Sequence, residues 1–417
     1  MQLMKDTDIA HMKLLLILAN MLVFGDMAAS LVSFINNDGH AIRADFKAYY
    51  TAARTLNDGV NNAVGSALYD FDAQRAVQHR IQSETQFSDL PVMLVPFINP
   101  PQLALLLSPL AHLPYAQAFM LWSLSSMLAG GLIIRLLLTQ SREFSRSDRW
   151  LIVSFFLACP FWVISLFAGQ LSSWLALAIL GCWAALKHGR STLAGICIVL
   201  AMVKPQLLIF PCLFLLTERR WRSMASIAGG GALIVGVTGV ALGWEVWAGW
   251  LHALQVMGQD SEAMRAFPYR MHNVRALLLL ALGFDQVLLA SAINLVLVLL
   301  AVIILLWAWR TPAPTPEIFD LRFALAVALG TLLSPWLHAY DTLINIVSVF
   351  LLSRALHGSR WEPWLVYAMM MVFMLLFVTD CHPWIGIPFQ LVLIGMLIRR
   401  LRRASTAANL ACGGVPS

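Results

Sequence analysis

The chain has 417 residues, of which 59% are hydrophobic and 12% are charged, and its mean hydropathy is +0.74. Because soluble globular domains carry about 25% charged residues, this composition excludes a soluble multidomain protein. It predicts an all-α, polytopic bundle of transmembrane helices. The net charge of +6 comes from 28 Lys and Arg against 22 Asp and Glu. The basic residues fall between apolar runs, as in the cytoplasmic loops of membrane proteins, so we exclude nucleic acid as a partner.

The first apolar run extends from Met12 to Phe34 and is long enough to span a membrane. No small-residue cleavage site follows it, so we interpret it as a retained span rather than a signal peptide. The hydrophilic segment 36–95 comes next and is the longest in the chain. Its aromatic residues and apolar periodicity predict a long outer loop that contains ordered short helices.

An acidic residue introduces the first of these helices. Residues 43–54 are Arg-Ala-Asp-Phe-Lys-Ala-Tyr-Tyr-Thr-Ala-Ala-Arg, with Asp45 directly before a helical pattern. From its position alone, Asp45 is either the N-cap of this helix or a functional carboxylate that the helix presents. Tyr49, Tyr50 and Arg54 recur on adjoining faces of the same helix.

The segment between Pro96 and Gln140 is mostly apolar but is interrupted by prolines. Proline ends or kinks a helix. We therefore expect a short helix from Pro100 to Leu113 that dips into the outer leaflet or packs on the bundle. One full span from Tyr115 to Leu138 follows it.

Further apolar runs complete a bundle of about 12 spans. They cover residues 151–167, 171–186, 191–203, 205–217, 223–243, 284–309, 322–338, 342–357, 362–379 and 384–398. Basic clusters enclose pairs of these runs, which places both termini in the cytoplasm. We expect residues 1–400 to form a single transmembrane domain, residues 244–280 a second outer loop and residues 401–417 a cytoplasmic tail. The tryptophans of residues 244–250 suit a helix lying in the membrane interface.

Three polar residues stand out on the expected outer side. Lys204 lies between two short apolar runs, opposite the basic clusters. It is either a functional cation at membrane depth or a lysine that snorkels to the interface. His338 and Asp341, three residues apart, could line a pocket, hydrogen-bond to each other or share a metal ion. No third ligand is evident, so we expect no metal.

Several short motifs follow one another along residues 40–345. They are Asp-Phe-x-x-Tyr-Tyr-x-Ala-Ala-Arg at 45–54, a proline-rich stretch from Asn99 to Trp122, Gly-Gln-Leu-Ser at 169–172, Lys-Pro-Gln at 204–206 and Ser-Pro-x-x-His at 334–338. In this order they resemble glycosyltransferase family 87, polytopic GT-C enzymes that include mycobacterial mannosyltransferases. Ser172 stands where the family usually has Asn. Residues 269–273 depart from the family's Asn-x-Ser pattern, which leaves the substrate open.

The resemblance implies transfer of a hexose, mannose being the best-known one, from a polyprenyl-phosphate sugar to a lipid or glycan acceptor. It also implies a site on the periplasmic face of a bacterial inner membrane. In GT-C enzymes the acid after the first span acts as general base, and Asp45 has the matching position. A carboxylate can take the proton of the attacking hydroxyl in a single displacement that inverts the anomeric centre. The lipid phosphate leaves as an anion, which nearby cations stabilise.

On this interpretation the candidate side chains form two groups. The residues expected to bind the donor phosphate or sugar are Lys204, Gln206, Arg270, His272, Arg275, His338, Asp341 and Gln170. Those expected on the acceptor side are Tyr49, Tyr50 and Arg54. Besides the lipid-linked donor, the acceptor and membrane lipids, we expect no cofactor. A lipid-sugar flippase or small-molecule transporter is the alternative function, but the single large outer loop and the lack of an internal repeat favour the enzyme.

Overall fold

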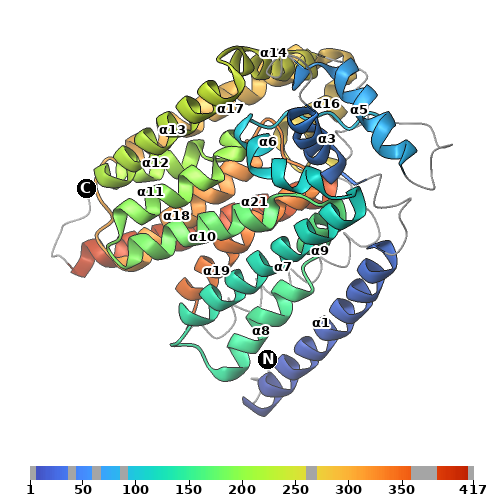
Figure 1. Ribbon diagram of the computed structural model, residues 1–417. Coiled ribbons are helices and arrows are strands. Elements are labelled where there is room, and N and C mark those ends of the chain that lie inside the picture. Colours follow the sequence, from blue (N-terminus) through green and yellow to red (C-terminus); the bar gives the residue numbers. More distant parts are fainter. Residues whose placement is uncertain are drawn as a thin grey trace.

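The computed structural model describes residues 6–35, 44–58, 67–84, 93–259, 270–357 and 383–411. Within these ranges every regular element is a helix, apart from one isolated β-bridge between Met271 and His338. The all-α prediction is therefore confirmed for this part of the chain (Figure 1).

The helices follow one another in this order in the described parts of the chain. The α-helices are α1 (Asp6–Ile35), α3 (Phe46–Asn57), α5 (Phe71–Ser83), α6 (Gln102–Leu107), α7 (Tyr115–Thr139), α8 (Arg146–Leu157), α9 (Pro160–Ala168), α10 (Ser172–Lys187), α11 (Ser191–Leu200), α12 (Ile209–Thr217), α13 (Trp221–Leu242), α14 (Glu245–Gln259), α16 (Val274–Leu282), α17 (Val287–Ala308), α18 (Pro316–Leu332), α19 (Ile346–Ala355) and α21 (Pro383–Ala411). The 3-10 helices are η1 (Ser108–His112), η2 (Ala201–Val203), η3 (Pro205–Leu207), η5 (Phe284–Gln286) and η6 (Ala339–Asn345).

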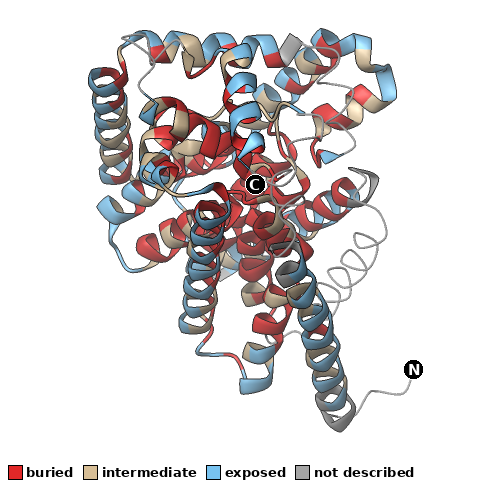
Figure 2. Ribbon diagram, turned by 45° about the vertical axis from the view of Figure 1, so that its right-hand side comes forward, coloured by how far each residue is buried: buried red, intermediate tan, exposed pale blue. Residues whose placement is uncertain are grey.

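Two central helices form the buried middle of the bundle. α18 is buried over almost its whole length and packs against α12, α19 and α21, while α10 packs against α7, α11 and η6. Figure 2 shows this buried interior surrounded by helices whose outer faces are exposed. A helix that is apolar on every side must be surrounded by other helices or by lipid. In this bundle α10 and α18 are surrounded by other helices and lie at its centre.

The peripheral helices α1, α13 and α17 carry large apolar side chains on their outer faces. Leu22 of α1, Val240 of α13 and Leu288 of α17 are 76%, 80% and 74% exposed. Water would penalise such contiguous apolar faces, whereas lipid tails accept them. These helices therefore form the lipid-facing rim of a membrane protein.

Five helices in the described ranges are long and apolar enough to cross a membrane. They are His11–Ser30, Tyr115–Thr139, Arg146–Ala168, Trp221–Leu242 and Phe284–Ala308. Shorter apolar helices cover Gln102–His112, Ser172–Lys187 and Ser191–Val203. The expected run 362–379 lies outside the described residues, so the count of about 12 spans stays a prediction.

The first half of the chain follows several local predictions. α7 covers Tyr115–Thr139, one residue longer than the span expected there, and α6 with η1 forms the short helix expected before it. In the described part of segment 36–95, α3 and α5 confirm the ordered short helices. Asp70 directly precedes α5, and its carboxylate caps the helix by accepting hydrogen bonds from two backbone N–H groups of the first turn.

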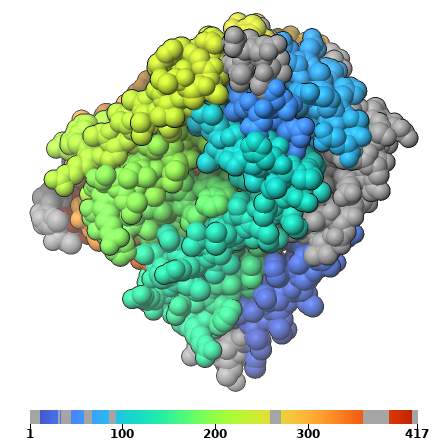
Figure 3. Space-filling view, viewed as in Figure 1, coloured from blue at the N-terminus to red at the C-terminus, as the bar shows by residue number. Residues whose placement is uncertain are grey.

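α3, α5 and α14 lie together at one end of the bundle. In Figure 3 this end is at the top, with α3 and α5 in blue beside the yellow α14. α14 crosses the ends of α13 and α17 instead of continuing along them (Figure 1). The indole Nε1 of Trp250 donates to the carbonyl of Ile98 at 3.0 Å, which fixes α14 to the segment that follows α5. The predicted tryptophan-rich helix thus covers this end of the molecule.

Three helix breaks bring polar residues into the bundle. α9 ends at Gly169, a pair of 3-10 turns flanks Lys204, and α18 ends just before Ser334 and Pro335. Proline has no backbone N–H and restricts the residue before it. Irregular backbone at membrane depth is tolerated where it lines a cavity or is buried in protein. Residues at all three breaks line one cavity.

Candidate active site

The cavity has a volume of about 1060 Å³ and lies where the helix breaks meet α3, α14 and α17. The predicted site residues that line it are Asp45, Tyr49, Gln170, Lys204, Gln206, Arg270, Arg275 and His338. Apolar side chains cover other parts of the wall, including Ile164, Phe167, Leu254, Leu295 and Val298. Residues from distant parts of the sequence therefore surround a single space with polar and apolar regions.

Asp45 precedes α3, but its side chain makes no capping hydrogen bond to that helix. Its Oδ2 instead accepts a hydrogen bond from Nε2 of Gln170 at 2.8 Å. The N-cap interpretation of this side chain is therefore wrong, and the carboxylate is part of the cavity wall. Tyr49 lies one turn further along the same face of α3 and lines the cavity as well.

Gln170 connects three side chains from different elements. Its Nε2 donates to Asp45 and, at 3.0 Å, to the hydroxyl of Tyr340, while its Oε1 accepts from the hydroxyl of Tyr49 at 2.6 Å. A primary amide has two donor protons and one acceptor oxygen. All three groups are therefore engaged, and the amide orientation is fixed by its partners.

Gly169 positions Gln170. Its φ of 66° lies in the left-handed region, and a Cβ on this residue would lie 2.6 Å from Cβ of Phe46. The carbonyl of Gly169 accepts a hydrogen bond from the indole Nε1 of Trp122 at 2.7 Å. Only glycine satisfies both the backbone conformation and the close packing, so the turn presents Gln170 to α3.

Lys204 forms a buried ion pair with Asp341. Its Nζ lies 2.7 Å from Oδ1 and 2.8 Å from Oδ2 of this carboxylate, and Ser172 donates to Oδ1 at 2.8 Å. Asp341 is fully buried, and the lysine side chain is 10% exposed. Lys204 therefore remains inside the bundle, which contradicts the snorkelling interpretation. Its Nζ also lies 5.2 Å from the ring centre of Tyr340.

Two arginines contribute further positive charge to the cavity wall. Arg275 is buried at the start of α16, where its Nε donates to the hydroxyl of Ser291 at 2.9 Å. Its guanidinium carbon lies 5.9 Å from the ring centre of Trp336. Arg270 is exposed and lines the same space. A guanidinium presents several donors in a plane, which suits a phosphate group.

A sequence model of glycosyltransferase family 87 matches residues 97–335, more than half of the chain. The chain belongs to glycosyltransferase family 87. No curated protein and no solved structure matches it. The protein is thus a membrane glycosyltransferase, as the motifs indicated. The match begins after Asp45 and ends before His338 and Asp341, so the argument for these three residues comes from their geometry.

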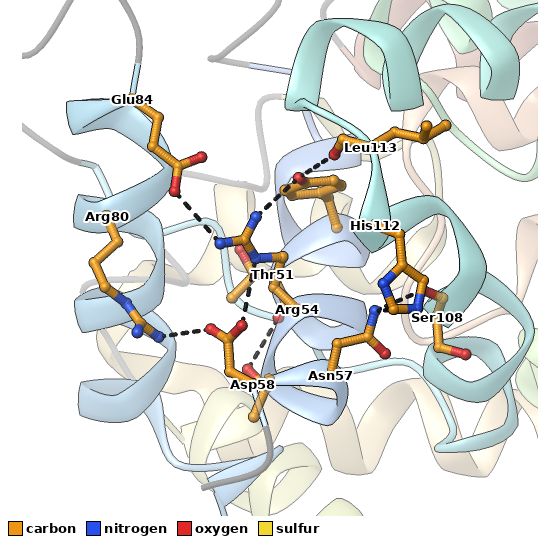
Figure 4. Close-up of polar contacts among 11 residues, drawn as sticks. Thr51, Arg54, Asn57, Asp58, Arg80, Glu84, Ser108, His112 and Leu113 are labelled. Carbon is orange, nitrogen blue, oxygen red and sulfur yellow. Dashed lines mark hydrogen bonds and ion pairs between the residues drawn. The ribbon is translucent and has the colours of Figure 1, made fainter.

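Four predicted residues of this family 87 glycosyltransferase are not part of the cavity lining, namely Tyr50, Arg54, His272 and Asp341. The hydroxyl of Tyr50 donates to the carbonyl of Leu113 at 2.7 Å, and burial raises the pKa of Tyr50. Arg54 lies between Asp58, at 3.7 Å, and Glu84, at 3.4 Å, in the polar cluster of Figure 4. Both side chains come from the face of α3 next to that of Tyr49, because successive helical residues turn by about 100°.

His272 also lies apart from the cavity lining of the family 87 enzyme. It is fully buried, its backbone N–H donates to the carbonyl of Leu337 at 2.9 Å, and its own carbonyl accepts from Gln390 at 2.6 Å. Its ring packs directly against Gly386, where a Cβ would clash with the imidazole. The structure therefore places His272 in the packing between α16 and α21.

His338 belongs to the cavity wall, and its ring stacks on Tyr340 with 5.2 Å between ring centres. Asp341 accepts hydrogen bonds from Lys204 and Ser172 instead of joining His338 in a cluster of metal ligands. In the part of the chain that the structure describes, no group of three His, Cys, Asp or Glu side chains could hold a metal ion.

The sequence reasoning missed several polar residues of the family 87 site. Tyr340 links Gln170 to the segment after α18, and Ser291 and Asn294 add hydroxyl and amide groups to the wall from α17. Ser291 and Asn294 are three residues apart within a long apolar run. Polar residues on one helical face of such a run indicate a cavity. The sequence therefore contained a pattern from which Ser291 and Asn294 could have been predicted as cavity residues.

Proposed function

We propose that this protein transfers a hexose, most simply mannose, from a polyprenyl-phosphate sugar to a lipid or glycan acceptor, with inversion. The observation that carries the proposal is that Asp45 shares one cavity with the cations Lys204, Arg270 and Arg275. A general base must reach the acceptor hydroxyl while cations face the leaving phosphate. This cavity has room for both groups.

In the proposed reaction, an oxygen of the acceptor attacks the anomeric carbon of the donor. The bond from that carbon to the phosphate oxygen breaks, and the phosphate leaves with the electron pair. The acceptor proton passes to the carboxylate of Asp45, which Gln170 holds from one side. Tyr49, beside Asp45 in the cavity wall, is the proposed acceptor-side residue.

The leaving phosphate is proposed to lie near the two arginines. The charge of Lys204 is balanced by Asp341 at 2.7 Å, so the pair contributes little net charge. Arg275 and Arg270 therefore supply most of the positive field available to a phosphate, while Gln206 and His338 line the wall for hydrogen bonds to the sugar. Stabilisation of developing charge by preorganised donors is commonly the largest catalytic term.

The apolar part of the wall supports a lipid-linked donor. Leu254 of α14 and Leu295 and Val298 of α17 line the cavity, and α17 carries exposed apolar residues on its outer face. A prenyl chain would bury its surface there, whereas a water-soluble sugar donor would not use these side chains. A flippase or transporter would also use an apolar wall, but membership of a glycosyltransferase family favours the enzyme.

We further propose that the protein lies in a bacterial inner membrane, with both termini cytoplasmic and the cavity end periplasmic. The arginines near residue 400 in α21 support this orientation through the positive-inside trend. Single cysteines at Asp58 and at Arg402, labelled by a membrane-impermeant reagent in intact cells, test it. Labelling at Asp58 alone is expected, and the reverse pattern would overturn the orientation.

The decisive experiment measures transfer from synthetic polyprenyl-phosphate mannose by purified wild type and Asp45→Asn. Asn keeps the shape of the side chain but cannot accept the proton, so turnover should fall about 1,000-fold or more while donor binding persists. Asp58→Asn, at the other end of α3 and outside the cavity, is the matched control. Equal turnover by wild type and Asp45→Asn would show that Asp45 is not the base.

A further inference from the structure

The environment of Gln170 differs from that of a ligand-binding amide. Both donor protons face protein oxygens, at 2.8 Å in Asp45 and 3.0 Å in Tyr340, and its oxygen accepts from Tyr49 at 2.6 Å. The side chain is almost completely buried, with the residue only 5% exposed. A sugar oxygen could accept a hydrogen bond from Gln170 only by displacing Asp45 or Tyr340, because both amide protons are already donated.

We propose that Gln170 is a positioning residue that fixes the orientation of the Asp45 carboxylate, instead of a donor-binding residue. The inference rests on the proposed role of Asp45 as general base. Gln170 holds Oδ2 of Asp45 through one amide proton, and the hydroxyl of Tyr340 also hydrogen-bonds to this carboxylate. A base that is already held within a few tenths of an ångström of the productive geometry loses little conformational entropy when the transition state forms.

The hydrogen-bond chain also fixes the amide itself. Tyr49 can only donate to Gln170 through its hydroxyl proton, so it selects the amide oxygen and leaves both N–H groups for Asp45 and Tyr340. The left-handed backbone of Gly169 and the bond from Trp122 hold the turn beneath it. The amide orientation is therefore specified on two sides, as expected of a residue that orients another one.

The test compares wild type with Gln170→Ala and Gln170→Glu. Gln170→Glu has almost the same volume, which guards against a collapse of the site, and it replaces the donor with a like charge. For both variants we expect kcat to fall about 10- to 100-fold with the donor KM within about twofold of wild type.

Ser173→Ala is the matched control, because Ser173 is a buried residue of the neighbouring turn of α10 and does not line the cavity. It should leave kcat and KM unchanged. A rise in the donor KM of Gln170→Ala, with kcat unchanged, would overturn the proposal and assign Gln170 to donor binding.

A second readout does not depend on turnover. Infrared difference spectroscopy follows the carboxylate bands that disappear in Asp45→Asn. These bands should shift in Gln170→Ala but not in Ser173→Ala, and unchanged bands in Gln170→Ala would overturn the positioning role. If wild type transfers no sugar but the bands shift, the proposed reaction fails while the contact between Gln170 and Asp45 stands.

Discussion

Lys204 and Asp341, separated by 137 residues in the chain, form a two-point ion pair inside the bundle. The pair joins the break between η2 and η3 to η6, and Ser172 adds a hydrogen bond from the start of α10. Charges at this depth are costly unless they are paired. The pair therefore fixes three helix breaks relative to one another around the cavity.

Replacing one member of this ion pair should destabilise the protein more than replacing both members together. Asp341→Asn leaves the lysine charge buried, and we expect a loss of about 3–5 kcal/mol in the free energy of unfolding. Lys204→Met leaves the carboxylate in the same position. The double variant should lose less than the sum of the two single variants, which unfolding of the purified protein in detergent measures. Additive losses would show that the two side chains do not interact.

Gly169 should tolerate no side chain. Gly169→Ala forces a Cβ against Phe46 in a left-handed backbone, and the combined cost is about 3 kcal/mol. Gly189→Ala is a matched control, because φ there is 70° but no atom lies within 4 Å of the added Cβ. Its cost should be limited to the backbone term of about 1–2 kcal/mol. Equal shifts in melting temperature would contradict the packing argument.

Tyr49 and Tyr50 are neighbours with different expected effects. Tyr49→Phe removes the donor to Oε1 of Gln170, so transfer should fall about 3- to 10-fold through a looser amide. Tyr50→Phe removes a bond to the carbonyl of Leu113 and should cost about 1 kcal/mol of stability with transfer largely retained. Transfer rates and melting temperatures of both variants provide the comparison. A raised acceptor KM in Tyr50→Phe would instead support the sequence-based prediction that Tyr50 lies on the acceptor side.

Arg275 should influence the donor more than any exposed arginine. Arg275→Gln removes the guanidinium charge from the wall, and kcat/KM for the polyprenyl-phosphate sugar should fall about 100-fold. Arg275→Lys keeps the charge but loses the Nε bond to Ser291, so a loss of about tenfold is expected. Arg80→Gln, which removes an exposed ion pair with Asp58, serves as the control. Equal donor kinetics in Arg275→Gln and wild type would place the phosphate elsewhere.

Composition and local sequence patterns were enough to predict the class of protein and several of its helices. The scarcity of charge and the long apolar runs required a helical membrane bundle, because backbone N–H and C=O groups in lipid must pair within the helix. The prolines around α6 and the apolar run of α7 located both helices, since local stereochemistry limits where helices end. The order of the motifs indicated the family, which the match over residues 97–335 confirmed.

Which of these side chains contact one another became clear from the packing of the helices. Position alone left Asp45 as a cap or a functional acid, and the contact with Gln170, 125 residues away, decided between them. Spacing grouped His338 with Asp341, yet Asp341 pairs with Lys204 from another helix break. His272 was expected to bind the donor, but its ring packs against Gly386 of α21. Local sequence sets helix periodicity and breaks, whereas side-chain partners depend on how distant helices pack, because burial and hydrogen bonding are properties of the assembled bundle.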